Sequence, residues 1–146
     1  MSIVFDFFSG IGGFHHALLS SNSNEKENKK TSIKKIFPFD VNTNANIIYN
    51  HNFSISPSTC TLESLKLNEY NKLCEKHGIV GSEIIWFMSP PCQPFTSLGN
   101  QRDLDDERTT GFRNLIDNIL LNTSHPPDYL ILENVKNFEV KILRLI

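Results

Sequence analysis

A cysteine in a proline-rich loop is the residue of this 146-residue chain with the clearest chemical potential. Cys92 lies within residues 89–96, which read Ser-Pro-Pro-Cys-Gln-Pro-Phe-Thr. Each proline fixes its own φ and pushes the preceding residue towards extended geometry, so the loop has few conformations and holds the thiol in a set direction. A thiolate is a strong nucleophile towards polarised carbon. The loop predicts either a mounted nucleophile or a rigid turn with an inert cysteine, and on its own it does not separate the two.

A carboxylic acid is the best partner for such a nucleophile in this sequence. Glu133, followed by Asn134 and Val135, comes directly after the apolar run 129–132. At the end of a buried strand its carboxyl would lose hydration, which favours the protonated form and lets it donate to a ring nitrogen. The alternative is a carboxylate that caps a helix or forms a salt bridge. No histidine lies within the cysteine motif, so the sequence does not indicate a Cys-His protease.

Two further sites indicate a nucleotide-type ligand. Residues 9–13 read Ser-Gly-Ile-Gly-Gly and follow an apolar run, and such a turn lets a ligand approach the backbone and the N-terminus of the next helix. His15 stands where the dinucleotide fingerprint has its third glycine, so an oxidoreductase is a poorer match. Asp40 follows the apolar run 36–39 and is placed to accept both hydroxyls of a ribose. Its alternative role is the N-cap of a helix beginning at Val41.

The elements that must position these residues alternate between strands and helices. Apolar runs predict strands at 3–8, 36–39, 84–88 and 129–132, and the segments between them have helical periodicity, for example at Ala45, Ile48, Tyr49 and Phe53. This order predicts an α/β fold with a mostly parallel sheet and flanking helices, which binds ligands beyond the carboxyl ends of its strands. Residues 20–35 are expected to be a mobile insertion, because 20–30 contain no large apolar side chain.

Composition excludes several classes of protein. A net charge of −2 gives no global field that would attract nucleic acid, so only local phosphate contacts from Arg102, Arg108 and Arg113 are expected, and scattered arginines are also typical of solvated surface. The three cysteines lack metal-ligand spacing and are expected to be free thiols, with no metal bound. Because no apolar run approaches the length of a membrane span, we expect an intracellular protein of the cytoplasm or nucleus that does not bind membranes.

Three motifs, in this order, resemble those of the S-adenosylmethionine-dependent cytosine-C5 methyltransferases. Residues 8–13 resemble the cofactor motif of that family, 91–93 its nucleophile motif and 133–135 its glutamate motif. Further stretches at 15–18, 40–53, 91–96, 108–109 and 133–139 are most similar to the branch called DNA methyltransferase two, whose members act mainly on the anticodon loop of aspartate tRNA.

The resemblance implies a Rossmann-like methyltransferase core that uses S-adenosyl-L-methionine to methylate cytosine C5 in nucleic acid, with tRNA favoured over DNA as the partner. Cys92 would add to C6 of the cytosine, and Glu133 would hydrogen-bond or protonate N3. Pro91 and Val135 would shape the substrate pocket, and Asn134 would brace the cysteine loop. The cofactor would lie against Phe8, Gly10, Ile11, Gly12, Gly13, Asp40 and Val41, with Asp40 on the ribose.

The sequence departs from the family in two places. The family often has an acid that reads the adenine amino group near the third strand end, where this chain has Thr-Cys-Thr at 59–61. There is also no counterpart of the arginine-bearing motif, the target-recognition domain or the late helix of the cofactor pocket. We therefore expect residues 1–146 to be the N-terminal part of a catalytic domain that depends on a missing C-terminal half. The alternative is an inactive fragment or pseudoenzyme that binds cofactor weakly. A thiol-redox or unrelated nucleotide-binding module does not explain the order of the motifs.

Overall fold

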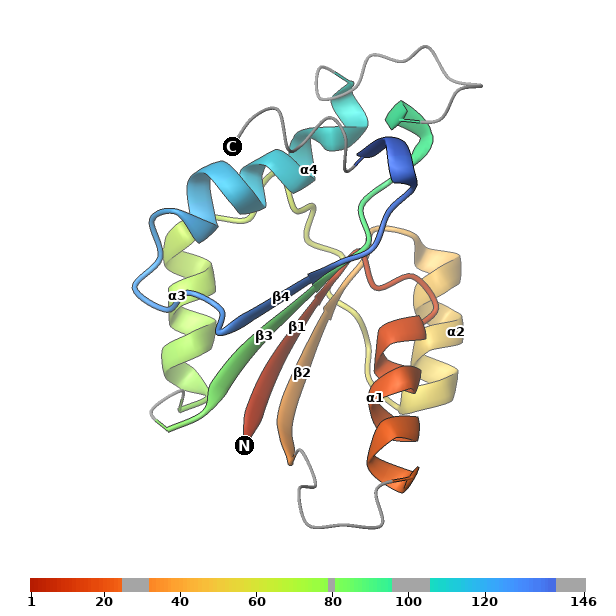
Figure 1. Ribbon diagram of the computed structural model, residues 1–146, viewed down its shortest axis with the longest axis vertical. Helices are drawn as coiled ribbons and strands as arrows, with labels where there is room; N and C mark the ends of the chain where they lie inside the picture. The colour runs from red at the N-terminus through yellow and green to blue at the C-terminus, as the bar shows by residue number, and fades with distance from the viewer. Residues whose placement is uncertain (25–31, 79–80, 96–105, 139–146) are drawn as a thin grey trace.

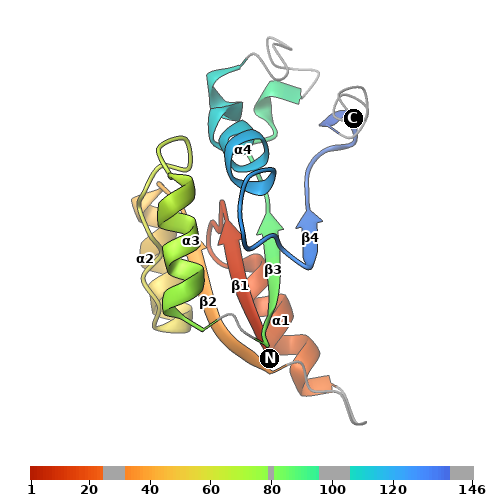
Figure 2. The ribbon, with the colours of Figure 1, turned by 90° about the vertical axis from the view of Figure 1, so that its left-hand side faces the viewer.

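Four parallel strands form the centre of the protein. The computed structural model describes residues 1–24, 32–78, 81–95 and 106–138. The strands are β1 (Ser2–Phe7), β2 (Ile33–Phe39), β3 (Glu83–Met88) and β4 (Tyr129–Leu132), and they lie in the order β2-β1-β3-β4. All four point in one direction, so their carboxyl ends meet at the same edge of the sheet (Figure 2). The predicted α/β fold is confirmed.

Helices cover both faces of this sheet (Figure 1). Helices α1 (Gly13–Asn24) and α2 (Thr43–Phe53) lie on one face, and α3 (Leu67–Lys76) and α4 (Thr110–Arg113) lie on the other. Helix α4 lies between a 3-10 turn, η3 (Glu107–Thr109), and a π-helical segment, η4 (Asn114–Leu120), while a short 3-10 turn, η1 (Gln93–Phe95), follows Cys92. This is the arrangement that a parallel sheet requires, because its central strands must be buried on both faces.

The side chains of β1 divide the core into two parts. All six residues of β1 are buried, and alternate side chains point to opposite faces. Phe5 belongs to the larger cluster, on the side of α3, where it packs against Tyr70 at 4.9 Å between ring centroids. Val4 belongs to the smaller cluster, on the side of α1, which includes Phe87 of β3 and is covered by Phe14. The central strand is thus fixed by apolar contacts on both sides.

Two details differ from the sequence-based expectation, and a third, a proline within a strand, is explained by the order of the sheet. Helix α1 continues to Asn24 and β2 begins at Ile33, so both ends of the expected insertion at 20–35 are regular structure, while 25–31 lie outside the described residues. Ile48 is exposed, because the buried face of α2 follows the four-residue spacing of Ala45, Tyr49 and Phe53. Pro38 is accommodated within β2 because β2 is an edge strand.

Strand β4 is not buried, contrary to expectation. Its four residues, Tyr129 to Leu132, have exposed fractions of 55, 40, 45 and 37%. The strand lies at the other edge of the sheet and pairs only with β3 among the described residues, so a consecutive apolar run there does not imply burial. Among the described ranges, no helix combines the length and apolar character needed to cross a membrane.

Candidate active site at the strand ends

Parallel pairing brings the predicted site residues to one edge of the sheet. Phe7 pairs with Phe39 and with Met88, and Met88 in turn pairs with Leu132. The segments that follow these four positions therefore begin next to one another at the edge of the sheet, although they are far apart in the sequence. They contain Gly10, Asp40, Cys92 and Glu133.

Asp40 braces the glycine turn. Its Oδ2 accepts a hydrogen bond from the Gly10 N–H at 2.8 Å, and its Oδ1 accepts one from the Asn42 N–H at 2.8 Å. The alternative role as a helix N-cap is wrong, because Asn42 caps α2 by accepting from the N–H groups of Asn44 and Ala45. Each carboxylate oxygen of Asp40 has a further lone pair, so the side chain can still accept ligand hydroxyls.

Phe8 is held in an unusual backbone conformation next to this turn. Its φ of 60° lies in the left-handed region, which is costly for a residue with a Cβ. The Ser89 hydroxyl donates to the Phe8 carbonyl at 2.9 Å, and the Ser89 N–H donates to Phe7 O at 3.3 Å. The start of the cysteine loop therefore fixes the position of Phe8. Such strain is frequent at functional sites.

Phe8 and Asp40 line a cavity of about 290 Å³ beyond the strand ends. This volume is at the lower end of the range for small-molecule sites, and the mixture of apolar walls with a few polar groups is typical of them. Of the predicted residues, Val41 and Pro91 also line it. Cys60 and Thr61, which stand where the family often has the acid that reads the adenine amino group, line it too, as does Arg108. The sequence analysis did not assign the remaining lining residues to the site: Phe39, Leu62, Glu63, Glu107 and Gly111.

The remaining residues of the glycine turn do not line this cavity. Gly12 has φ +94°, and a Cβ there would lie 2.3 Å from Cε2 of Phe53. Its lack of a side chain therefore allows α2 to pack against the turn. Ile11 is 58% exposed, and Gly13 is exposed at the start of α1. Ile11 and Gly13 do not have the close contact with α2 that Gly12 has. The predicted contact of the glycine turn with the methionine part of a cofactor stays a prediction.

His15, in the place of the third fingerprint glycine, is part of the packing between α1 and α2. Its ring stacks on Phe53 with centroids 4.0 Å apart, and its Nδ1 shares a hydrogen bond of 2.8 Å with the Tyr49 hydroxyl. Burial lowers the pKa of His15, which favours the neutral imidazole. A structural role for this histidine follows from these contacts.

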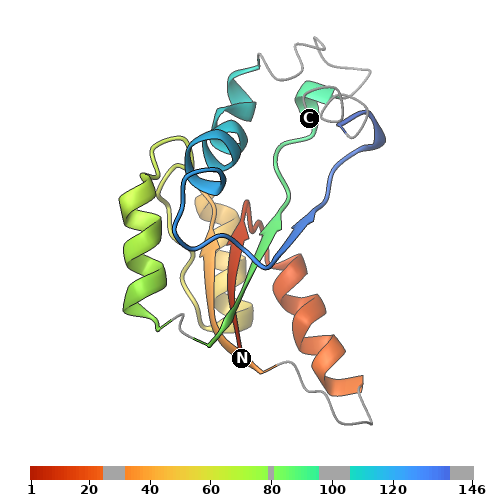
Figure 3. The same ribbon diagram turned by 60° about the vertical axis from the view of Figure 1, so that its left-hand side comes forward.

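The loop that carries Cys92 is fixed from the side of β4. The Asn134 side-chain amide donates to Pro90 O at 2.8 Å, and the Asn137 amide donates to Phe95 O at 3.2 Å. The rings of Phe95 and Phe138 meet at 4.7 Å, and Figure 3 shows the two segments side by side above the sheet. Asn134 therefore makes the contact that a brace of the cysteine loop requires. Cys92 and Cys60 are free, partly buried thiols, and Cys74 is a free thiol buried in the core.

Glu133 is exposed, so the expectation that strand burial would remove its hydration is wrong. It follows β4, and its N–H donates to Met88 O at 2.9 Å, which fixes its backbone beside the cysteine loop. Its side chain is open to solvent because the strand before it is exposed. Val135 is partly buried and packs against the larger core cluster, and its place in the substrate pocket stays a prediction.

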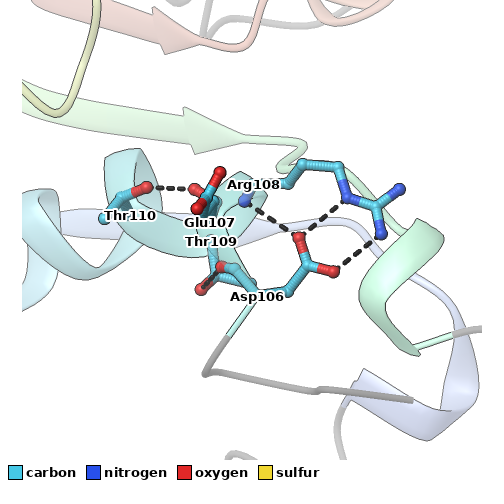
Figure 4. A network of polar contacts seen from close by, with 5 residues as sticks. All are labelled: Asp106, Glu107, Arg108, Thr109 and Thr110. Carbon is cyan, nitrogen blue, oxygen red and sulfur yellow. Dashed lines mark hydrogen bonds and ion pairs between the residues drawn. The ribbon is translucent and has the colours of Figure 1, made fainter. Parts of the chain in front are cut away.

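Arg108 lies at the rim of the cavity and is paired with a carboxylate (Figure 4). Its Nε donates to Asp106 Oδ1 at 2.8 Å and its Nη2 donates to Asp106 Oδ2 at 2.7 Å. This side-chain pairing raises the pKa of the guanidinium. Thr110 closes the same turn by donating to Glu107 O. Because it is paired, Arg108 offers less charge to a phosphate than a free arginine would. Of the other two arginines expected to contact phosphate, Arg113 has its Nε 3.8 Å from Asp117 Oδ2, and Arg102 is outside the described residues.

The cavity residues fit an adenosine-containing ligand. Phe8, Val41 and Leu62 provide apolar walls for an aromatic base, and Asp40 provides lone pairs for hydroxyl groups. No group of three or more His, Cys, Asp or Glu side chains in the described ranges could hold a metal ion.

Comparisons with known proteins identify a family and several relatives. Residues 3–141 match the family described as C-5 cytosine-specific DNA methylase. The chain is 41% identical over 142 residues to a mouse tRNA (cytosine(38)-C(5))-methyltransferase, which covers 97% of this chain and 30% of the relative. It is 39% identical over 138 residues to a DNA (cytosine-5)-methyltransferase of Dictyostelium discoideum, covering 94% and 32% respectively.

Solved structures with the same fold belong to similar enzymes. The S. pombe Dnmt2 methyltransferase has a TM-score of 0.71 and 30% sequence identity, and the match covers 99% of this chain and 42% of that one. The Entamoeba histolytica methyltransferase EhMeth has a TM-score of 0.73 and 32% identity, covering 96% and 40%. The chain spans about a third of the length of the curated relatives it matches. Because the family match extends over nearly all of its residues and the motifs lie at adjacent strand ends, the chain belongs to the C-5 cytosine-specific DNA methylase family.

Proposed function

We propose that this chain takes part in S-adenosylmethionine-dependent methylation of cytosine C5 in nucleic acid, with tRNA as the favoured substrate. The observation that carries the proposal is the position of Cys92, in a loop tied to the end of β4 by Asn134 and to Phe8 of the cavity wall by Ser89. These hydrogen bonds hold the nucleophile in a fixed position relative to a cavity of nucleoside size. The names of the curated relatives, most of which are tRNA (cytosine(38)-C(5))-methyltransferases, favour tRNA over DNA.

The proposed chemistry assigns one step to each side chain. The Cys92 thiolate adds to C6 of a cytosine turned out of its stack, which moves electron density to C5. Glu133 hydrogen-bonds or protonates N3 and so stabilises the charge on the ring. S-adenosylmethionine, when bound, supplies an electrophilic methyl group for C5. Loss of the C5 proton then allows the C6–S bond to break and restores the thiol.

The proposed cofactor contacts follow the cavity. Phe8 and Val41 would pack on the adenine, Asp40 would accept the ribose hydroxyls, and residues 10–13 would pass close to the methionine part. The second candidate function is a non-catalytic protein with weak cofactor binding, which the exposure of Glu133 and β4 favours.

A trapping experiment with tRNA in which the cytosines carry fluorine at C5 tests the proposal. Fluorine cannot leave as a proton does, so the reaction should stop at a covalent protein–RNA adduct that a denaturing gel resolves. We expect the protein at its natural length to form this adduct only with S-adenosylmethionine present, and Cys92→Ala to form none. Cys74→Ala, which removes a thiol from the core, serves as the control and should retain the adduct.

The other outcomes are equally informative. An adduct that persists in Cys92→Ala would contradict the assignment of the nucleophile. Reaction with the matching DNA and not with tRNA would overturn the substrate preference and keep the chemistry. Absence of any adduct with either nucleic acid, in a protein that still binds S-adenosylmethionine, would favour the non-catalytic alternative.

A further inference from the structure

The carboxyl group of Asp6 is buried beneath the glycine turn without a hydrogen-bond partner. Asp6 lies on β1 between Pro38 of β2 and Phe87 of β3 and is 1% exposed. Neither of its carboxyl oxygens has a partner among the described residues, and the same holds for Ser9 Oγ and Asn46 Oδ1. Unpaired buried polar groups are rare and costly, so three of them around one turn call for a functional explanation.

These groups surround Asp40, the residue that braces the turn. The Ser9 N–H donates to Phe39 O at 3.0 Å, and the Asn46 side-chain amide donates to Asp40 O at 2.8 Å. Asp6 lies close enough to Asp40 for the two carboxyl groups to interact electrostatically. Asp40 also binds the Gly10 N–H and lines the cavity, so a charge on Asp6 acts on the proposed cofactor site through Asp40.

Asp6 is the group in this cluster whose charge changes near neutral pH. Burial, and to a smaller extent the charge of Asp40, raise the pKa of Asp6 to about 7. On the side of α2 it faces Tyr49, whose own pKa is raised by burial and by Asp6, so the phenol stays neutral. From α1, His15 binds the Tyr49 hydroxyl, and burial lowers the pKa of its imidazole. Near pH 7 these two neighbours are therefore uncharged.

We propose that Asp6 is a positioning residue whose ionisation is linked to binding of the cationic cofactor beside Gly10 and Asp40. This inference rests on the proposed function. S-adenosylmethionine carries a sulfonium and an ammonium against one carboxylate, so its net charge is positive. A positive charge near the turn favours the ionised form of Asp6, and the carboxyl proton is released to solvent when the cofactor binds.

Two consequences follow for cofactor affinity. Below pH 7 Asp6 is mainly protonated and attracts the cofactor less, so the affinity for S-adenosylmethionine should rise between about pH 6 and pH 8. The expected rise is on the order of 10-fold for charges separated by several ångströms in a partly desolvated site. S-adenosylhomocysteine lacks the sulfonium charge and should show a weaker dependence on pH.

Calorimetric titration of the protein at its natural length, at several pH values, tests this inference. We expect Asp6→Asn, which keeps the shape of the side chain and cannot ionise, to bind S-adenosylmethionine with nearly constant affinity from pH 6 to pH 8. His15→Gln, which removes the imidazole that could otherwise account for the titration, should keep the pH dependence. The exposed Asp117→Asn is the matched carboxylate control and should behave as the wild type. Titration in buffers of different ionisation enthalpy should show proton release in the wild type and not in Asp6→Asn.

Each other result overturns the inference in a recognisable way. A flat pH profile in the wild type, or absence of proton release, would refute the linkage without affecting the proposed function. A dependence that survives in Asp6→Asn and disappears in His15→Gln would assign it to the imidazole instead. A wild-type protein that binds neither ligand at any pH would refute the cofactor site, and the role of Asp6 with it.

Discussion

At the scale of single residues, Asp40 combines a structural and a chemical role. Its two oxygens each accept one backbone N–H, from Gly10 and from Asn42, which fixes both the glycine turn and the entry to α2. Asp40 also lines a cavity with apolar walls. A ligand hydroxyl therefore meets an acceptor that is already oriented, and little side-chain entropy is lost on binding.

Asp6, two residues before Phe8 in the chain, should make the stability of the protein depend on pH. Its pKa rises from the ordinary 3.8 to about 7 on folding, so the folded state binds more protons between these values and stability falls as pH rises through this window. The difference corresponds to roughly 4 kcal/mol. We expect Asp6→Asn to gain stability relative to the wild type from pH 4.5 to pH 7.5, as measured by urea unfolding. Parallel profiles for the two proteins would contradict this.

At the scale of elements, the sequence predicted those features that depend on local pattern. Apolar runs located all four strands, and the turn residues located the strand ends where Gly10, Asp40, Cys92 and Glu133 lie. It did not predict that 20–24 are helical, because a polar sequence continues a helix that is anchored by buried residues such as His15. It did not predict that Leu62, Glu63, Glu107 and Gly111 line the cavity, because tertiary packing brings their two segments together.

The packing of α2 against the glycine turn should depend on Gly12. An alanine Cβ there would lie 2.3 Å from Phe53 Cε2 and 3.0 Å from the Tyr49 ring, at a φ that favours glycine. We expect Gly12→Ala to destabilise the fold by about 2–4 kcal/mol, from overpacking and backbone strain. Gly13→Ala, whose Cβ would meet nothing within 4 Å, is the control and should change the free energy of unfolding by less than about 1 kcal/mol. Equal effects in thermal unfolding would contradict this explanation.

At the scale of the whole molecule, burial is distributed unevenly across the sheet. β1 and β3 lie at its centre and are almost wholly buried, whereas β4 is exposed along its entire length. This difference explains why four equally apolar runs did not all become core: position in the sheet, which a single sequence does not give, decides how much of each strand is covered. Exposed apolar edge strands are templates for association between chains.

The 146-residue chain should therefore self-associate through β4. We expect Ile131→Lys to reduce the apparent mass in light scattering at high protein concentration, because a charge on an edge strand opposes edge-to-edge pairing. Ile48→Lys is a close control, since Ile48 is 46% exposed and Ile131 is 45% exposed, but Ile48 lies on a helix. If both substitutions reduce association equally, general surface apolarity and not the strand edge is responsible.

The hydrogen bond from Ser89 to the Phe8 carbonyl has a mechanical consequence. Phe8 lines the cavity, and Ser89 is separated from Cys92 only by two prolines. The connection from Phe8 through Ser89 to Cys92 therefore has little conformational freedom. Under the proposed function, the adenine ring of the cofactor packs against Phe8, and the position of Phe8 determines the position of Cys92 Sγ relative to the sheet. The methyl donor and the nucleophile would then be aligned with each other before any nucleobase enters, which leaves the base as the single component that must move.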